Sequence, residues 1–315
     1  MRDALLHLIY RLGIPSLLRL KKNGFLTVLC LHRISDERDF FFNPIQVKTF
    51  ELLIDYLSKY YTIIPFFDAE KKTLKPKLIL SFDDGYYDFI EHAMPILKKK
   101  GLPANHNIVN DCVNNNATIW TQQLNDIFNH LRDNEITNDK DINQLSNFEN
   151  NWNLYYLTIF KKFLSMDLEH RVNLLNMIKD KYKISSSYRM MNWDDIKYIS
   201  KNDVEIGSHT YNHNPLSIIN GKQLFQTEIL NSIDEINTKI GKSINILSLP
   251  NGVANSELSS FIEKSTIKYV LLVDDKINKM PLQNATNYIS RIYLMDNPIY
   301  ETILRTECFH SILKR

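Results

Sequence analysis

The chain has 315 residues, of which 44% are hydrophobic and 23% charged, and its formal net charge is +2. This composition is typical of an ordinary globular protein, and the length suffices for one large barrel or for two modest domains. Because the charge is near neutral and no block of like charges stands out, nucleic acid is not indicated as a partner.

The three cysteines, Cys30, Cys112 and Cys308, are far apart, odd in number and without CxxC spacing. This pattern argues against a disulfide framework and against a zinc site built from thiolates. It suits a reducing compartment.

Residues 1–24 are predicted to form an amphipathic helical segment. Its apolar residues are interrupted by polar ones and by Pro15, so it has neither the apolar core of a secretory signal nor the roughly 20 apolar residues of a membrane span. We therefore expect a cytoplasmic protein. The leucines, with Arg11, Arg19, Lys21 and Lys22 nearby, belong either to a helix that packs on the main fold or to one that lies on a membrane surface.

Residues 25–315 alternate between short apolar runs and helical patterns. Apolar residues at three and four spacing follow the first runs, as in Phe50–Leu57 and Phe89–Leu97. Such repeated units predict an α/β fold with a parallel sheet, open or closed into a barrel. The predicted strands cover residues 26–31, 78–82, 204–206, 244–249, 269–273 and 289–294.

One stretch, from about 112 to 191, breaks this alternation and is rich in Asn, Asp and Lys. Two sets of residues at helical spacing, one around Leu124–Leu131 and one around Trp152–Phe163, predict a helical insertion between barrel strands. Its aromatic residues form either a small core of their own or a lid or substrate platform.

Two motifs indicate chemistry. Ser81-Phe82-Asp83-Asp84-Gly85-Tyr86 follows an apolar strand, so that two carboxylates reach the rim of the sheet. Far downstream, His209 and His213 are four residues apart, a spacing that on one helical turn places both imidazoles on the same face, within reach of one ion. Two histidines, one aspartate and a spare aspartate predict a metal hydrolase site with its own base.

Together these motifs resemble the polysaccharide deacetylase family, with its NodB-homology domain. The resemblance extends to Cys-Leu-His-Arg-Ile at 30–34, Trp-Asp-Asp-Ile at 193–196 and Leu-Pro-Asn-Gly at 249–252. It spans most of the chain outside the insertion, and two motifs in the correct order are a specific signal. The resemblance implies a distorted (β/α) barrel and a divalent metal that serves to remove acetyl groups, usually from amino sugars of a glycan.

Transferred to this sequence, the family pattern implies that Asp83 is the general base. Asp84, His209 and His213 then hold the ion. Such a ligand set accepts Zn²⁺, Co²⁺, Ni²⁺ or Fe²⁺, and we choose Zn²⁺ on availability and geometry. Ser208 and Thr210 either orient the ligands or act as simple caps.

The turn with Asn251 resembles the family segment whose backbone N–H stabilises the oxyanion. Family members often carry an arginine two residues before that proline to tether the base, but this chain has Ser248 there. Arg291 either replaces it from another strand and keeps Asp83 ionised, or is a structural arginine.

A general acid is needed for the departing amine, and histidine suits that role. His32 is the better candidate, because part of the family resembles a circular permutation in which an early histidine supplies the acid; otherwise it is a histidine of the barrel rim. His310 lies at the extreme end in a predicted helix, and His106 either lines the pocket or packs in the core. The remaining histidines are expected on ordinary helices: His7, His92, His130 and His170.

We therefore expect a metal-dependent hydrolase that removes N-acetyl groups from amino sugars of a cell-envelope polysaccharide or its precursor. The expected partner is a glycan or a lipid-linked sugar, with membrane contact through the N-terminal helix as an alternative to packing. Three other functions remain open: a catalytically silent glycan-binding protein on the same fold, an O-deacetylase or deformylase, and a metal hydrolase for another bond.

Overall fold

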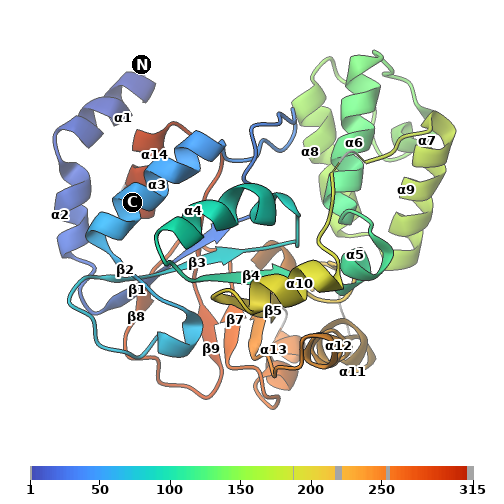
Figure 1. Ribbon diagram of the computed structural model, residues 1–315. Coiled ribbons are helices and arrows are strands. Elements are labelled where there is room, and N and C mark those ends of the chain that lie inside the picture. Colours follow the sequence, from blue (N-terminus) through green and yellow to red (C-terminus); the bar gives the residue numbers. More distant parts are fainter. Residues whose placement is uncertain (1, 187, 217–221, 253–255, 311–315) are drawn as a thin grey trace.

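The computed structural model describes the chain except for residues 1, 187, 217–221, 253–255 and 311–315, and its centre is a ten-stranded sheet (Figure 1). The main strand order is β10-β1-β3-β4-β5-β6-β7-β9, with β2 beside β3 and β8 beside β1. The strands are β1 Phe25–Leu31, β2 Thr62–Ile63, β3 Lys77–Phe82, β4 Ala104–Ile108, β5 Val204–Ser208, β6 Ile246–Ser248, β7 Tyr269–Leu271, β8 Asn278–Lys279, β9 Asn287–Ile289 and β10 Ile292–Tyr293.

Every described pairing is parallel except that of β1 with β8, and the sheet curves into a nearly closed barrel. Its two ends are β9 and β10, which are joined by Ser290 and Arg291 alone. The single strand predicted over 289–294 is therefore wrong: it is two strands, one at each end of the sheet. This short link carries Arg291 across the opening of the barrel.

Two helices precede the barrel. α1 Arg2–Arg11 packs beside the last described helix, α14 Ile299–Thr306, with His7 against the ring of Tyr300 (Figure 1). α2 Ile14–Leu20 leads to Lys22, whose ammonium group lies buried 3.5 Å from the Glu307 carboxylate. The N-terminal segment is thus anchored on the barrel through one face only, because Leu6 is the one buried residue of α1.

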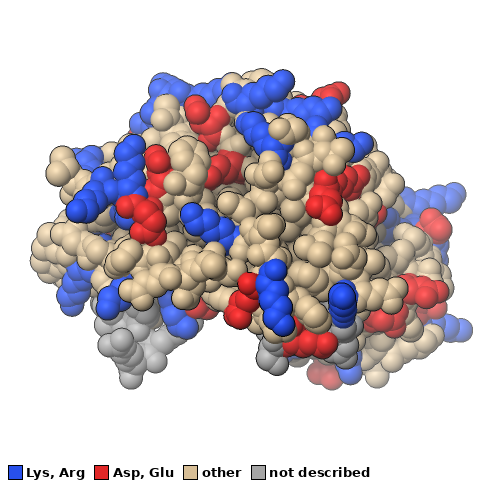
Figure 2. Space-filling model, turned by 90° about the horizontal axis from the view of Figure 1, so that it is seen from below, with Lys and Arg blue, Asp and Glu red and all other residues tan. Residues whose placement is uncertain are grey.

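The surface carries mixed charge. On the face shown in Figure 2, basic and acidic side chains are interspersed, in keeping with the net charge of +2. Within the described ranges, no helix combines the length and the apolar character that crossing a bilayer requires.

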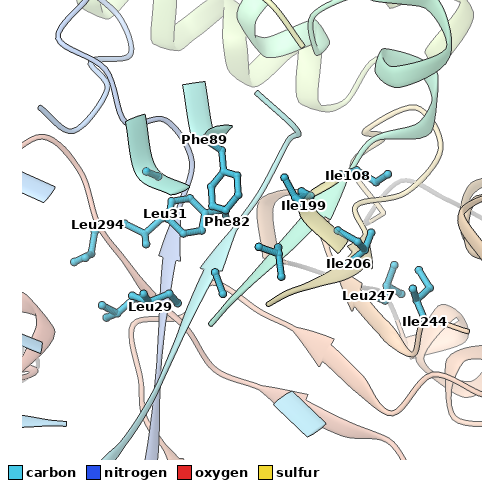
Figure 3. Packing of buried hydrophobic residues seen from close by; sticks show 14 of the residues in the cluster. Leu29, Leu31, Phe82, Phe89, Ile108, Ile199, Ile206, Ile244, Leu247 and Leu294 are labelled. Atoms are coloured by element: carbon cyan, nitrogen blue, oxygen red, sulfur yellow. The ribbon is translucent and has the colours of Figure 1, made fainter. Parts of the chain in front are cut away.

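The main core lies between the outside of the barrel and the helices that cover it (Figure 3). Leu29 and Leu31 of β1 and Phe82 of β3 pack there against the covering helices, as their apolar spacing predicts. These helices and the short turns beside them are α3 Val47–Tyr60, η1 Phe66–Asp68, η2 Phe89–Ala93, α4 Met94–Lys99, α10 Trp193–Ser200, α11 Lys222–Phe225, η3 Gln226–Leu230, α12 Asn231–Ile240, η4 Pro250–Gly252 and α13 Ser256–Ile262.

The inside of the barrel changes from apolar to polar along the strands. Successive side chains of a strand point to opposite faces, and a second cluster, including Val28 and Ile79, takes the positions between those of the main core. Continuing the same alternation brings Cys30, Ser81 and Asn107 inside, further along their strands, where all three are buried. A polar layer therefore lies between the apolar interior and the rim at which the strands end.

The segment predicted as an insertion is helical and forms a separate bundle beside the barrel mouth (Figure 1). Phe128, Tyr155 and Phe163 belong to its own hydrophobic cluster, which also receives Phe41 from the loop after β1. The aromatic residues thus do form the small core that was one of the two alternatives. The helices of the segment are α5 Asn110–Asn115, α6 Trp120–Asp133, α7 Lys140–Asn143, α8 Trp152–Leu164 and α9 Leu168–Tyr182.

Candidate active site

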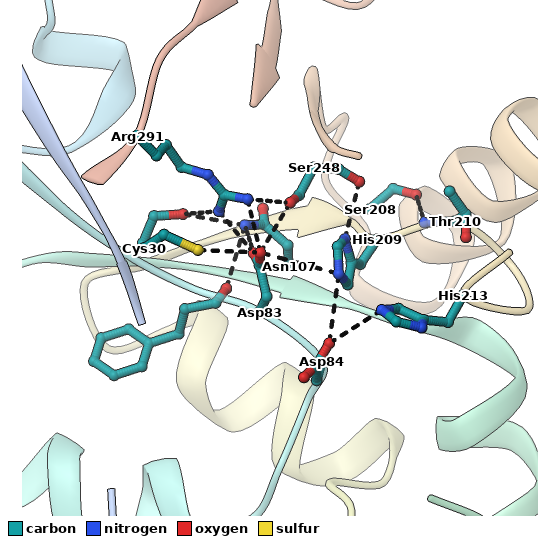
Figure 4. A network of polar contacts seen from close by, with 12 residues as sticks. Cys30, Asp83, Asp84, Asn107, Ser208, His209, Thr210, His213, Ser248 and Arg291 are labelled. Atoms are coloured by element: carbon teal, nitrogen blue, oxygen red, sulfur yellow. Dashed lines mark hydrogen bonds and ion pairs between the residues drawn. The ribbon is translucent and has the colours of Figure 1, made fainter. Parts of the chain in front are cut away.

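Asp83 follows directly after β3 and is held by the polar layer of the barrel (Figure 4). Arg291 binds it in a bidentate manner, donating from Nη1 to Oδ1 at 2.9 Å and from Nη2 to Oδ2 at 2.8 Å. Asn107 donates to Oδ1 at 2.7 Å, and Ser248 donates to Oδ2 at 3.1 Å. The thiol of Cys30 is 3.7 Å from Oδ2. The carboxylate therefore has little freedom to rotate.

Burial alone would raise the pKa of Asp83, but the Arg291 guanidinium and the nearby His209 outweigh it and hold this pKa well below its usual range. Both partners of the pair are almost fully buried, with side-chain exposures of 0% for Arg291 and 2% for Asp83. Asp83 is thus ionised at neutral pH.

Asp84 points to a different group of side chains. Its Oδ1 lies 3.4 Å from Nε2 of His209 and 3.5 Å from Nε2 of His213 (Figure 4). One ligand atom from each of these three residues lies within 4.8 Å of the other two. Buried Oδ1 nevertheless accepts no hydrogen bond among the described residues. A buried carboxylate oxygen without a donor, facing two imidazole nitrogens, is what a cation site offers, so this donor set fits a divalent metal.

The two imidazoles differ in their surroundings. Burial lowers the pKa of His213 to about 3, and its protonation is further opposed by His209. Burial also acts to lower the pKa of His209, but Asp83 and Asp84 outweigh it and raise that pKa. Nδ1 of His209 is 2.9 Å from the backbone oxygen of Ser248, so this nitrogen carries the proton and Nε2 is left to bind an ion.

The predicted helical turn carrying the two histidines is wrong. His209 follows β5, and His213 lies four residues later in an irregular loop. Their rings still meet, with centroids 4.9 Å apart, because Thr210 and His213 adopt positive φ angles of 67° and 54°.

Strained backbone marks this site. Asp84 has φ 80° and Asn251 has φ 59°, in addition to the two residues of the histidine loop. Positive φ is uncommon outside glycine, and for a β-branched residue such as Thr210 it is a true outlier. Such strain costs about 1–3 kcal/mol per residue and gathers at functional sites.

Two glycines permit close approaches. A Cβ on Gly207 would lie 2.1 Å from Oδ1 of Asn107, so this position must be glycine if Asn107 is to reach Asp83. From the sequence we expected Gly207 to allow a sharp turn before His209, and this prediction is wrong, because Gly207 lies inside β5. Gly252 has φ 70°, and a Cβ at this position would lie 2.5 Å from the backbone nitrogen of Val273, so only glycine allows the turn after Asn251 to pack there.

His32 lies on the far side of Asp83 from the histidine pair, at the end of β1. Its ring packs edge-on against Phe42 and Tyr293, with centroids 5.8 and 5.3 Å away. Burial lowers its pKa, and the carboxylates of Asp84 and Asp83 partly offset this. One of its ring nitrogens lies within 4.8 Å of the Asp83 carboxylate, and so does Cys30 Sγ.

Cys30, His32 and Asp83 form a second group at metal-ligand spacing, but it fits an ion less well. Both oxygens of Asp83 already bind Arg291, and burial raises the pKa of Cys30 well above its ordinary value, which keeps the thiol protonated. The group around Asp84 is therefore the better metal site.

The other predicted residues are placed as follows. Ser208 exchanges a hydrogen bond with Ser232 and accepts one from the backbone of Thr210, which ties down the loop after His209. His106 is fully buried in the core between the rings of Phe82 and Phe89, and burial lowers its pKa to about 3. His310 lies beside Asp275.

A cavity of about 400 Å³ opens above the carboxylates and the histidines. Asp83 and Asp84 both border it, with His32 and Asn251 also in its lining. A larger hollow, of about 660 Å³, surrounds the start of β5 and β6 and contains none of the predicted site residues. Sequence reasoning missed the contacts of Asn107 and Cys30 with Asp83, although Asn105 and Asn107 at alternate positions of an apolar strand were a signal for the first.

The family model described as polysaccharide deacetylase matches residues 170–270, a segment that contains both histidines. No match was found among the curated proteins.

Several solved structures have the same fold. The Streptococcus pyogenes deacetylase PplD, in complex with acetate, is 14% identical over 90% of this chain and 98% of its own, with a TM-score of 0.59. IcaB from Ammonifex degensii is 15% identical over 90% and 97%, with a TM-score of 0.60. A de-N-acetylase from Aggregatibacter actinomycetemcomitans is 21% identical over 86% and 95%, with a TM-score of 0.52. These similarities confirm the predicted α/β barrel.

Proposed function

The resemblance of this chain to the polysaccharide deacetylases is confirmed by its fold and by the family model, and from it we propose that the protein hydrolyses N-acetyl groups of amino sugars in a cell-envelope glycan or its precursor. The observation that carries the proposal is the contrast between two adjacent carboxylates. Asp83 is bound by Arg291, whereas Asp84 faces two histidines. Hydrolysis of an amide needs both a base and an electrophile, and this arrangement separates the two tasks.

In this proposal Asp84, His209 and His213 hold the ion. A divalent ion there would make a water molecule more acidic and polarise the acetyl carbonyl, which suits a base as weak as Asp83. Asp83 takes the proton of the attacking water, and Arg291 keeps it ionised and oriented. The backbone N–H of Asn251 donates to the oxyanion, and His32 protonates the departing amine.

The missing arginine before Pro250 counts only weakly for the rival function, a glycan-binding protein without catalysis. Arg291 supplies the guanidinium from the link between β9 and β10 instead, which removes this argument. A binding module has no need of a carboxylate held in this way.

The metal content and the activity test the proposal together. Wild-type protein should bind about one equivalent of Zn²⁺, Co²⁺, Ni²⁺ or Fe²⁺ and release acetate from a panel of N-acetylated sugars and oligosaccharides. His209→Ala should lose the ion and lower acetate release by at least about 100-fold, because one of three ligands is removed. His170→Ala, an exposed position on α9, is the matched control and should change neither.

Elemental analysis of both variants distinguishes the outcomes. A His209→Ala protein that keeps its ion and its activity contradicts the site assignment. Metal binding through His209 without acetate release from any sugar favours the glycan-binding function, and release from esters or formamides alone favours the O-deacetylase or deformylase.

We also propose that residues 1–24 contact an anionic membrane surface. This segment has five Lys and Arg and one Asp, a net charge of +4, while the remaining chain has 33 basic and 35 acidic residues. Five leucines of this segment are between 53% and 72% exposed: Leu5 and Leu8 in α1, Leu12 in the turn after it, and Leu17 and Leu20 in α2. Exposed leucines beside basic residues are typical of helices that lie in the membrane interface. Such contact suits a lipid-linked sugar precursor in the cytoplasm.

Vesicle sedimentation checks this contact. Wild-type protein should bind vesicles rich in phosphatidylglycerol and be released by salt, and Leu8→Gln/Leu12→Gln should bind at least about tenfold more weakly. Leu74→Gln, in a loop before β3, removes a leucine that is even more exposed and should bind like the wild type. Equal binding of all three proteins to the vesicles contradicts the contact. So does a dimer in solution that Leu8→Gln/Leu12→Gln abolishes, because the exposed leucines would then bind a second copy of the chain.

A further inference from the structure

The cavity above the carboxylates has a second wall that does not come from the barrel. Residues of α6 and α8, in the helical segment 112–191, line it opposite the barrel rim. Tyr156, Leu157 and Phe160 extend from α8, and Gln122 and Asn125 from α6. The segment therefore forms a core of its own and also borders the site.

This wall presents aromatic rings in fixed positions. Phe41 stacks on Tyr156, with centroids 4.6 Å apart, and Phe160 stacks on Trp120 at 5.4 Å. A ring that a neighbour holds in place presents its remaining apolar surface at small entropic cost. The apolar C–H face of a sugar ring is a ligand surface of matching shape.

The loop with Phe41 is tied to the same helix. Asp39 accepts hydrogen bonds from the backbone N–H groups of Phe41 at 2.9 Å and Phe42 at 3.1 Å. It also accepts from Gln122 at 3.2 Å and Asn129 at 3.1 Å, both on α6. The buried carboxylate of Asp39 thus fixes the aromatic loop to the helical segment, on the cavity side.

Asn125 is the polar group of this wall that lacks an internal partner. It is 3% exposed and lines the cavity, yet its Oδ1 accepts no hydrogen bond within the described ranges. Its neighbour Gln122, by contrast, donates to Asp39 and Asp126 and accepts from Tyr86. A buried amide oxygen without a donor is destabilising, and a hydrogen bond from a ligand hydroxyl or amide N–H would remove that penalty.

We propose that α6 and α8 form a sugar subsite, in which Asn125 accepts a hydrogen bond from the glycan and the rings of Tyr156 and Phe160 pack against its apolar face. The inference rests on the proposed function and names the part of the protein that selects its substrate. The ligand class is an N-acetylated sugar or short oligosaccharide, since about 400 Å³ lies at the lower end of the roughly 300–1,000 Å³ of small-molecule sites.

Asn125→Ala tests the subsite. With a β-linked N-acetylglucosamine trimer as the probe, KM should rise about tenfold, the equivalent of one lost hydrogen bond, while kcat changes little. The melting temperature should stay the same or rise, because the variant removes an unsatisfied buried group. The matched control is Gln123→Ala on the same helix, whose amide donates to the backbone of Thr118 outside the cavity.

Binding measured without turnover separates this inference from the proposed function. Calorimetric titration of Asp83→Asn with the trimer, with and without Asn125→Ala, reports the subsite alone. Weaker binding by Asp83→Asn/Asn125→Ala than by Asp83→Asn supports the subsite, even if the wild-type protein releases no acetate. In that case the result contradicts the proposed function but not the subsite. Unchanged KM and binding, a melting temperature lowered by several degrees, or a trimer that neither binds nor reacts overturns the subsite.

Discussion

Asp83→Asn should lower kcat for acetate release by about 10²–10⁴-fold and leave the bound metal in place. An amide cannot take the proton of the attacking water, and general base catalysis typically contributes a factor of this size. The metal should remain because the ligand atoms come from Asp84, His209 and His213, and Asp83 Oδ2 is 4.0 Å from His209 Nε2. Acetate release and elemental analysis on the same preparation measure both effects.

The adjacent residue supplies the control. Asp84→Asn changes the same functional group one position along the chain, and it should lose both the metal and the activity. Loss of the ion in Asp83→Asn, or its retention in Asp84→Asn, would reverse the roles assigned to the two carboxylates.

The barrel and its reacting groups follow from local patterns. Strands β1 and β3 are apolar on both faces over most of their length, which is typical of parallel strands buried on both sides, and they were predicted within one residue of their bounds. Asp83 and Asp84 follow such a strand, and side chains at the ends of parallel strands meet at one rim. The four-residue spacing of His209 and His213 supplied the matching histidines, which the structure brings to the same place.

Contacts that depend on closure of the barrel were beyond the sequence. The predicted strand 289–294 is split because the sheet ends within it. The pattern of apolar residues over six positions does not indicate where a sheet ends. The same closure carries Arg291, in the link between β9 and β10, to Asp83. The arrangement of the histidine loop was missed because four-residue spacing favours a helix only when the residues between can be helical, and Thr210 is not.

The polar layer around Asp83 was within reach of sequence reasoning. Asn105 and Asn107 occupy alternate positions of a strand that is otherwise buried, and Ser81 precedes the acid pair by two residues. A period of two places all of them on the face that carries Asp83. Buried polar groups on one face of a strand require partners, so this pattern predicts a network inside the barrel.

Arg291→Gln should be the most destabilising single change in the site. Its guanidinium is fully buried and donates to Asp83, Ser81, Ser248 and the backbone of Leu272, so its removal leaves an unpaired carboxylate inside the barrel. Breaking a buried ion pair by removal of one partner costs about 3–5 kcal/mol, and activity should fall as well because Asp83 loses its orientation. Urea unfolding and acetate release measure the two losses.

A double-mutant cycle identifies the cause of that instability. Asp83→Asn/Arg291→Gln removes both charges, so the two amides can bond to each other and no unpaired ion remains. The double variant should be more stable than the sum of the single losses predicts, by about 1–3 kcal/mol, yet it should stay inactive. Additive losses would mean that Arg291 stabilises the closure of the barrel through Ser81, Ser248 and Leu272 rather than through its charge. Recovery of stability without recovery of activity would show that the buried ion pair serves to keep Asp83 ionised, and that it does not make the folded protein more stable.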